Sequence, residues 1–148
     1  MTDSFGTPSS LAIAVLTFKR NDEIKALLPH LIEQAGSIDL PAKVIVVDND
    51  PAGSARGFVT PFAGQDVIYT HEPEPGIAHG RNRALSAAAD VDLLVFIDDD
   101  ETPTPDWLRL MLATFRQIPC AGVVGNVVRS FDVEPDAWIK AGRYFDKD

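Results

Sequence analysis

The sequence contains little cysteine, no long apolar run and no signal-like start. Its single cysteine, Cys120, excludes a disulfide framework within the chain and fits a reducing compartment. We expect Cys120 to be a small core residue rather than a reactive thiol. No stretch approaches the roughly 20 apolar residues that span a bilayer. The first residues have no secretory pattern, and residues 1–10 are expected to form a disordered tail.

The chain also lacks basic excess and several catalytic patterns. Its 148 residues have a net charge of −9, and nucleic acid is not expected as a partner because phosphate-backbone binding leaves a basic footprint. No His or Cys cluster has the spacing of a zinc site. No Ser–His–Asp or Cys–His arrangement is evident, and no glycine-rich phosphate loop follows the first apolar run, which excludes a Walker loop or dinucleotide fingerprint.

What is present is an alternation of strand-like and helix-like patterns. Apolar runs predict strands over residues 11–17, 43–47, 67–70, 93–97 and 121–128. Helices are predicted from Asn21, with a kink or division at Pro29, then over residues 77–89, and after a Thr104 cap with Pro105 in the first turn. This alternation predicts an α/β fold with an open, mainly parallel twisted sheet and helices on both faces.

Ligands in such folds collect beyond the carboxyl ends of the strands. The segments that follow the first four predicted strands are TFKRN, DND, HEPEPG and DDDE. Parallel strands bring these ends to one edge of the sheet. We therefore expect the four segments to converge on one site.

The acidic cluster after the fourth predicted strand is the strongest chemical signal. Adjacent carboxylates at the rim of an apolar sheet are costly unless a cation compensates them. In an extended chain Asp98 and Asp100 point in similar directions and Asp99 points away. Such a pair offers hard oxygen ligands to Mg²⁺ or Mn²⁺. The alternative is a solvated acidic loop that caps the next helix.

The ends of the first two predicted strands offer a nucleoside pocket. Asp48 and Asp50 can accept hydrogen bonds from a ribose hydroxyl or a base N–H, although DND followed by proline is also a common turn. Thr17 to Arg20 can line the same pocket. Lys19 and Arg20 are equally explained as surface charge.

The segment GIAHGRNRAL suits an anion. Gly76 and Gly80 allow close backbone approach. Arg81 stands near a helix start, where a cation gains nothing from the helix dipole but can bind a diphosphate. The alternative is that Arg81 pairs with surface acids. Trp107 and Trp138 are expected to be packing residues.

In that order and spacing, the segments IAVLTFKRN, VIVVDND, GIAHGRNRAL and LLVFIDDDETPTPDWLRLML resemble family 2 glycosyltransferases of the GT-A fold. Within that family the chain is most similar to bacterial exopolysaccharide glucosyltransferases of the succinoglycan type. There the short motifs DND, SAR, ARN, DDDET and DWL recur, with glycine at position 80 in place of the usual alanine of ARN. The resemblance covers Leu11 to Tyr144.

The resemblance implies a site and a reaction. Asp48 would bind the uridine side of a UDP-sugar, Arg81 would lie near the diphosphate, and Asp100 would be the foremost metal ligand. The implied donor-site residues are Thr17, Phe18, Arg20, Asp48, Asp50, Gly76, Arg81, Asn82, Asp98 and Asp99, with Asp98 and Asp100 holding Mn²⁺ or Mg²⁺. No residue matches the general base of the family, which is expected beyond Asp148 in the acceptor-binding half. Residues 11–148 are thus expected to be the nucleotide-sugar-binding part alone.

The implied activity is metal-dependent, inverting transfer of a sugar to a saccharide or lipid-linked acceptor in exopolysaccharide synthesis. The resemblance favours glucose as that sugar. A cytoplasmic location is expected, with peripheral contact to the inner membrane face left open. One alternative is a non-catalytic nucleotide-binding module that retains the donor fold. A second is a sugar-phosphate nucleotidylyltransferase, which usually carries a glycine-rich signature that TFKRN does not supply.

Overall fold

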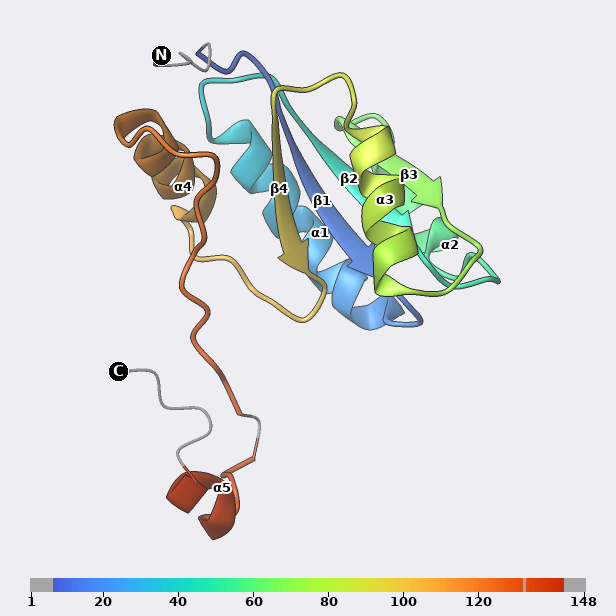
Figure 1. Ribbon diagram of the computed structural model, residues 1–148. Helices are drawn as coiled ribbons and strands as arrows, with labels where there is room; N and C mark the ends of the chain where they lie inside the picture. Colours follow the sequence, from blue (N-terminus) through green and yellow to red (C-terminus); the bar gives the residue numbers. More distant parts are fainter. Residues whose placement is uncertain (1–6, 132, 143–148) are drawn as a thin grey trace.

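The computed structural model describes residues 7–131 and 133–142, which form an α/β fold (Figure 1). Residues 1–6 of the predicted tail lie outside the described residues, while Ser9 donates hydrogen bonds to the Asp92 carboxylate from its backbone N–H and its hydroxyl. The sheet has the strand order β3-β2-β1-β4, and every pairing is parallel. Its strands are β1 (Leu11–Thr17), β2 (Ala42–Asp48), β3 (Val67–His71) and β4 (Leu93–Asp98). The predicted parallel sheet is confirmed.

Helices cover both faces of this sheet, as predicted (Figure 1). The helices are α1 (Asn21–Gly36), α2 (Arg56–Val59), the 3-10 helix η1 (Thr60–Phe62), α3 (Ile77–Ala87), α4 (Trp107–Gln117) and α5 (Ala137–Gly142). Side chains of β1 alternate between the two faces because successive residues of a strand point to opposite sides. Ile13 and Val15 face α1, whereas Ala12 and Ala14 face α3.

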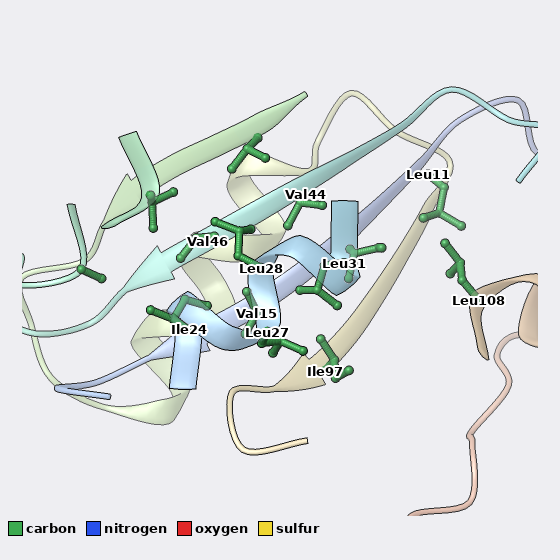
Figure 2. Packing of buried hydrophobic residues seen from close by; sticks show 14 residues of the cluster. Leu11, Val15, Ile24, Leu27, Leu28, Leu31, Val44, Val46, Ile97 and Leu108 are labelled. Carbon is green, nitrogen blue, oxygen red and sulfur yellow. The ribbon is translucent and has the colours of Figure 1, made fainter. Parts of the chain in front are cut away.

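The larger core lies under α1. Its Ile24, Leu27, Leu28 and Leu31 are buried against β1 and β2 and form one apolar face of the helix (Figure 2). The core under α3 is built from small residues, with Ala84 and Ala88 facing alanines of β1. Small side chains let α3 approach the sheet closely. This close packing brings the beginning of α3 near the carboxyl ends of the strands.

Proline does not divide α1. The helix continues through Pro29 to Gly36. Pro29 and Lys25 are both exposed, so the Lys25 carbonyl that loses its hydrogen-bond donor lies on the solvent side of the helix. Among the described residues no helix combines the length and the apolar character needed to cross a membrane.

The predicted fifth strand is wrong. Residues 121–128, all of them described, contain no strand and belong to the irregular trace that follows α4 (Figure 1). Val124 is 95% exposed. Gly122 and Gly125 interrupt the apolar run and weaken its preference for a strand. Cys120, next to this run, is only partly buried and belongs to neither core cluster, so its assignment to the core is also wrong.

The predicted Thr104 cap is wrong as well, because α4 begins at Trp107. A glutamine of α1, not a threonine side chain, forms hydrogen bonds with the backbone at the beginning of α4. The buried Gln34 carboxamide donates to the backbone carbonyls of Thr104 and Pro105 and accepts a hydrogen bond from the Leu108 N–H. Polar groups at a helix start need such partners, and here they come from another helix.

The core under α1 can be tested with one matched pair of substitutions. Leu31→Ala removes a fully buried side chain and is expected to lower the free energy of unfolding by about 2 to 5 kcal/mol. Leu110→Ala, at a side chain that is 53% exposed on α4, is expected to change it by less than about 0.5 kcal/mol. Urea unfolding followed by circular dichroism measures both. Equal losses would contradict this core.

Candidate functional site

The register of the sheet gathers the predicted site residues at one edge. Thr17 of β1 lies beside Asp48 of β2, and Asp48 lies beside His71 of β3. On the other side of β1, Leu16 lies beside Asp98 of β4. The chain builds the sheet outward from β1 through β2 to β3 and then returns to add β4 beside β1. This reversal between β1 and β4 is the position where ligands bind in open α/β sheets.

Asp48 is fully buried, and both of its carboxylate oxygens accept hydrogen bonds from the protein. Its Oδ1 accepts a hydrogen bond from the Asp50 N–H at 3.1 Å. Its Oδ2 accepts from the Ala55 N–H at 2.8 Å and from the Tyr69 hydroxyl at 2.9 Å. The exposed fraction of Asp48 is 0%. The carboxylate therefore fastens the loop of residues 50–55 to the end of β2.

The loop held by Asp48 has further anchors. The Asp50 carboxylate accepts a hydrogen bond from the Ala52 N–H, and this bond together with the nearby Ser54 hydroxyl lowers the pKa of Asp50. The His71 Nε2 lies 2.8 Å from the Asp50 carbonyl oxygen, which ties the end of β3 to this loop. The Arg56 guanidinium lies 4.8 Å from the centre of the Tyr69 ring, a distance typical of cation–π contacts.

Arg20 compensates the acidic cluster. Its Nη1 donates to Asp99 Oδ1 at 3.0 Å and to Asp100 Oδ2 at 2.7 Å. These two carboxylates raise the pKa of Arg20. Burial raises the pKa of Asp99, and the neighbouring Thr17 hydroxyl and Arg20 oppose that rise. The charge that a metal ion was predicted to balance is thus partly balanced by an arginine.

Asp98 faces a second arginine. The Arg81 Nη2 lies 3.8 Å from Asp98 Oδ1, and the guanidinium lies 5.7 Å from the centre of the Phe96 ring. The predicted divergence of the carboxylates is met only in part, because Asp99 and Asp100 share Arg20 while Asp98 has a separate partner. Asp98 and Asp100 nevertheless line the same hollow of about 770 Å³ together with Arg81, and Asp99 does not.

The segment that carries Arg20 is strained and incompletely bonded. Lys19 has a positive φ of 57°, which costs free energy in a residue other than glycine. Thr17 is buried, and its Oγ1 is the single buried side-chain oxygen or nitrogen of the described residues that has no hydrogen bond of good geometry. A strained turn and an unsatisfied buried hydroxyl beside an acidic cluster are features that concentrate at functional sites.

The acidic edge suits a divalent ion that keeps several non-protein ligands. The side chains of Asp98 and Asp100 are 66% and 59% exposed, so hard carboxylate oxygens face the hollow. Within the described part of the chain, no three His, Cys, Asp or Glu side chains lie close enough to enclose an ion. Mg²⁺ and Mn²⁺ commonly bind one or two carboxylates and complete their shell with water and phosphate. The donor set therefore fits such an ion.

The remaining predicted residues lie in the segment after β1 and at the beginning and middle of α3. Phe18 is 45% exposed and carries the Lys19 ammonium 5.2 Å from its ring centre. Gly76 precedes α3 with a φ of 149°, a conformation that other residues rarely adopt. Asn82 is exposed on the first half of α3.

Two residues with polar contacts at this edge were missed by the sequence analysis. Glu101 lines the hollow and its Oε2 accepts a hydrogen bond from the Asp98 N–H at 3.3 Å. Asn49 is buried and makes three side-chain hydrogen bonds to the segment of residues 72–76. A buried asparagine between two acids at the end of a strand was a usable signal, but its partners are distant backbone atoms that no local pattern reveals.

The three hydrogen bonds of Asp48 predict a stability effect. Asp48→Asn places an amide where one oxygen now accepts, which leaves a buried donor facing donors. We expect the free energy of unfolding to fall by about 1 to 3 kcal/mol. Asp66→Asn, at an exposed residue with positive φ that asparagine tolerates, is the control with little change. Chemical denaturation of both variants decides, and an unaffected Asp48→Asn protein would exclude this structural role.

Tyr69 predicts a pH effect. Burial, followed by the hydrogen bond to Asp48, raises the pKa of Tyr69 to about 12 from about 10. Because the folded pKa lies above the unfolded pKa, this contribution to stability is complete below about pH 10 and is lost as the pH rises toward 12. Ultraviolet titration should show a late phenol transition that Tyr69→Phe removes. A late transition that survives in Tyr69→Phe would refute the assignment.

The comparisons with known proteins agree with this geometry. Residues 12–146 match the model of glycosyl transferase family 2. The succinoglycan biosynthesis protein ExoM of Rhizobium meliloti is 32% identical over 139 residues, which are 89% of this chain and 43% of ExoM. The chain thus spans less than half of that relative.

Two solved structures have a similar fold. The mannosyltransferase PcManGT of Pyrobaculum calidifontis, in complex with GDP-Man and Mn²⁺, is 28% identical with a TM-score of 0.55, covering 69% of this chain and 30% of its own. S. aureus TarS in complex with UDP is 22% identical with a TM-score of 0.61, covering 73% of this chain and 32% of its own. The family match extends over nearly the whole chain and reaches all four strands. The chain belongs to glycosyl transferase family 2.

Proposed function

We propose that this chain forms the donor site of a glycosyltransferase that moves glucose from a UDP-sugar to a saccharide or lipid-linked acceptor during exopolysaccharide synthesis. Family membership supports sugar transfer, and the likeness to ExoM, a succinoglycan biosynthesis protein, supports the class of product. The chain spans 43% of ExoM, so the activity of the whole protein is part of what we propose. So is an assignment to the cytoplasm, with contact to the inner membrane face.

The observation that carries the proposal is the meeting of cations and acids at the β1–β4 reversal. Arg20 and Arg81 reach the acidic cluster from opposite sides, through Asp99 and Asp100 on one and Asp98 on the other. Guanidinium groups bind phosphate oxygens with directed hydrogen bonds. A diphosphate placed in the hollow beside Asp98 would exchange the weak 3.8 Å contact of Arg81 for a stronger one.

The proposed metal is Mn²⁺ or Mg²⁺, held by Asp98 and Asp100. The likeness to PcManGT, which was solved with GDP-Man and Mn²⁺, supports a nucleotide-sugar donor used with a divalent ion. When bound, such an ion supplies electrostatic compensation for the charge of a departing diphosphate. To accept it, Asp100 would have to leave Arg20, whose other hydrogen bond to Asp99 can remain.

The other residues divide along the length of a nucleotide sugar. Thr17, Phe18 and Asp50 are proposed to line the uridine end, where buried Asp48 holds the loop in place. Arg81, Gly76 and Asn82 are proposed to serve the diphosphate end from the beginning of α3.

The proposed chemistry is a single displacement with inversion. An acceptor hydroxyl attacks the anomeric carbon as the bond to the diphosphate breaks, and a base takes the hydroxyl proton. No residue of this chain is assigned as that base. The roles assigned to this chain are therefore to orient the donor and to hold the charge of the leaving group.

The proposal is tested by nucleotide binding to this chain in isothermal titration calorimetry. We expect UDP to bind in the presence of Mn²⁺ or Mg²⁺ and to lose most of its affinity when EDTA removes the ion. GDP should bind more weakly than UDP. Asp100→Ala should abolish the difference between metal and EDTA, because it removes the foremost proposed ligand.

Asp106→Ala is the matched control for that variant. Asp106 is an exposed aspartate close by in sequence whose partner is Arg109, so its removal should leave metal dependence intact. Failure of a folded wild-type sample to bind UDP with either ion would refute the donor site. Equal UDP affinity with and without metal would refute the role of the ion alone.

A further inference from the structure

Asn49 joins the end of β2 to the beginning of α3. Its Nδ2 donates to the Glu72 carbonyl at 3.0 Å and to the Glu74 carbonyl at 2.7 Å. Its Oδ1 accepts a hydrogen bond from the Gly76 N–H at 2.8 Å. The residue is 6% exposed. Both amide hydrogens are bonded within the protein, so the side chain has no free donor to offer a ligand.

The beginning of α3 depends on this link. The segment before it contains Pro73 and Pro75, which have no N–H to donate, and α3 has no side-chain cap hydrogen bond of its own. Gly76 takes a φ of 149°, and its N–H is the one bound by Asn49. Asn49 therefore sets the place where the chain turns into α3.

A second contact fixes the same helical turn against β1. A Cβ atom added at Gly80 would lie 2.7 Å from Leu16 Cδ2 and 3.7 Å from Asn49 Oδ1. The helix thus rests directly on the end of β1 at Gly80. With Gly76 tied to Asn49 and Gly80 against Leu16, the first turn of α3 is held at both ends.

Arg81 is the next residue after this held turn. Its direction toward Asp98 and across Phe96 follows from where the turn is placed. A shift of the turn would move the guanidinium away from the acidic edge. Among the described residues, the Asn49 side chain forms hydrogen bonds with residues 72, 74 and 76 and with neither Arg81 nor the carboxylates of residues 98–100.

We propose that Asn49 is a positioning residue for the diphosphate part of the donor site, acting by holding the first turn of α3 so that Arg81 faces Asp98. The inference rests on the proposed function, since it assumes a diphosphate at Arg81. It assigns Asn49 to the phosphates and not to the nucleoside, although Asn49 lies between the two acids of the proposed uridine end.

The experiment compares UDP with UMP, which lacks the second phosphate. Asn49→Asp turns a carboxylate oxygen toward the Glu72 and Glu74 carbonyls, where a donor stood. With Mn²⁺, we expect the Kd for UDP to rise about tenfold and the Kd for UMP to change less than about twofold. Asn49→Ser has a side chain too short for these hydrogen bonds and adds no charge. It should also weaken the binding of UDP more than that of UMP. Gln65→Glu, at an exposed residue ahead of β3, controls for the added charge.

A double-mutant cycle tests the route through Arg81. In an Arg81→Met background, Asn49→Asp should weaken UDP binding by less than about twofold, because the side chain that it positions is already absent. Equal weakening of UMP and UDP would place Asn49 at the nucleoside and overturn the inference. Additive effects of the two substitutions, or no effect of Asn49→Asp, would overturn it as well.

Hydrogen exchange separates this inference from the proposed function. Backbone amides of residues 76–81 should exchange faster in both Asn49 variants than in wild type, whether or not nucleotide is present. If wild type binds no UDP, the proposed function fails. If wild type binds UDP and exchange at residues 76–81 is unchanged in the variants, the positioning role fails alone.

Discussion

The parallel register of β1 with its two neighbours brings the ends of β1, β2 and β4 to one edge of the sheet. Because parallel strands end at the same edge, the residues that follow β1, β2 and β4 lie close together although they are far apart in the sequence. Thr17 lies beside Asp48, and Leu16 lies beside Asp98. The apolar residues of β1 and β2 are buried by helices on both faces, so this register is fixed by the core. A shift by one residue would turn every β1 side chain to the opposite face.

Charge at this edge is arranged in layers. Buried Asp48 accepts hydrogen bonds from backbone N–H groups and holds a loop. Half-exposed Arg20 binds Asp99 and Asp100, and Arg81 stands near Asp98. Exposed ion pairs of this kind contribute little to stability, and they can be exchanged for ligand contacts at small cost. The acids nearest solvent are therefore the ones available to an ion, while the innermost acid is committed to the fold.

Much of this could be predicted from local sequence. Mostly apolar runs identified all four strands, although only β1 and β2 are largely buried on both faces while β3 and β4 are partly exposed. The same rule failed for residues 121–128, since an apolar run becomes a strand only where a neighbour accepts its hydrogen bonds. The Thr104 cap failed because Gln34, 70 residues away in sequence, supplies the bonds instead.

The site, like the fold, has features that local sequence predicts and features that depend on distant contacts. The residue types at the strand ends indicated where the acids and arginines would gather, and they did gather at one edge. The pairing of Arg20 with Asp99 and Asp100 depends on a strained turn at Lys19 that no periodicity encodes. The work of Asn49 depends on backbone carbonyls in a proline-containing segment. Contacts between side chains and distant backbone are the part that sequence patterns do not carry.

Two carboxamides hold the beginnings of two helices: Gln34 binds the beginning of α4, and Asn49 binds the beginning of α3. Neither side chain titrates, so their grip is the same whether the neighbouring acids are protonated, ionised or bound to a cation. The positions of α3 and α4 therefore do not depend on the charge of the neighbouring carboxylates. In the proposed donor site, the aspartates and arginines at the edge of the sheet would exchange partners on binding while α3 and α4 keep their places.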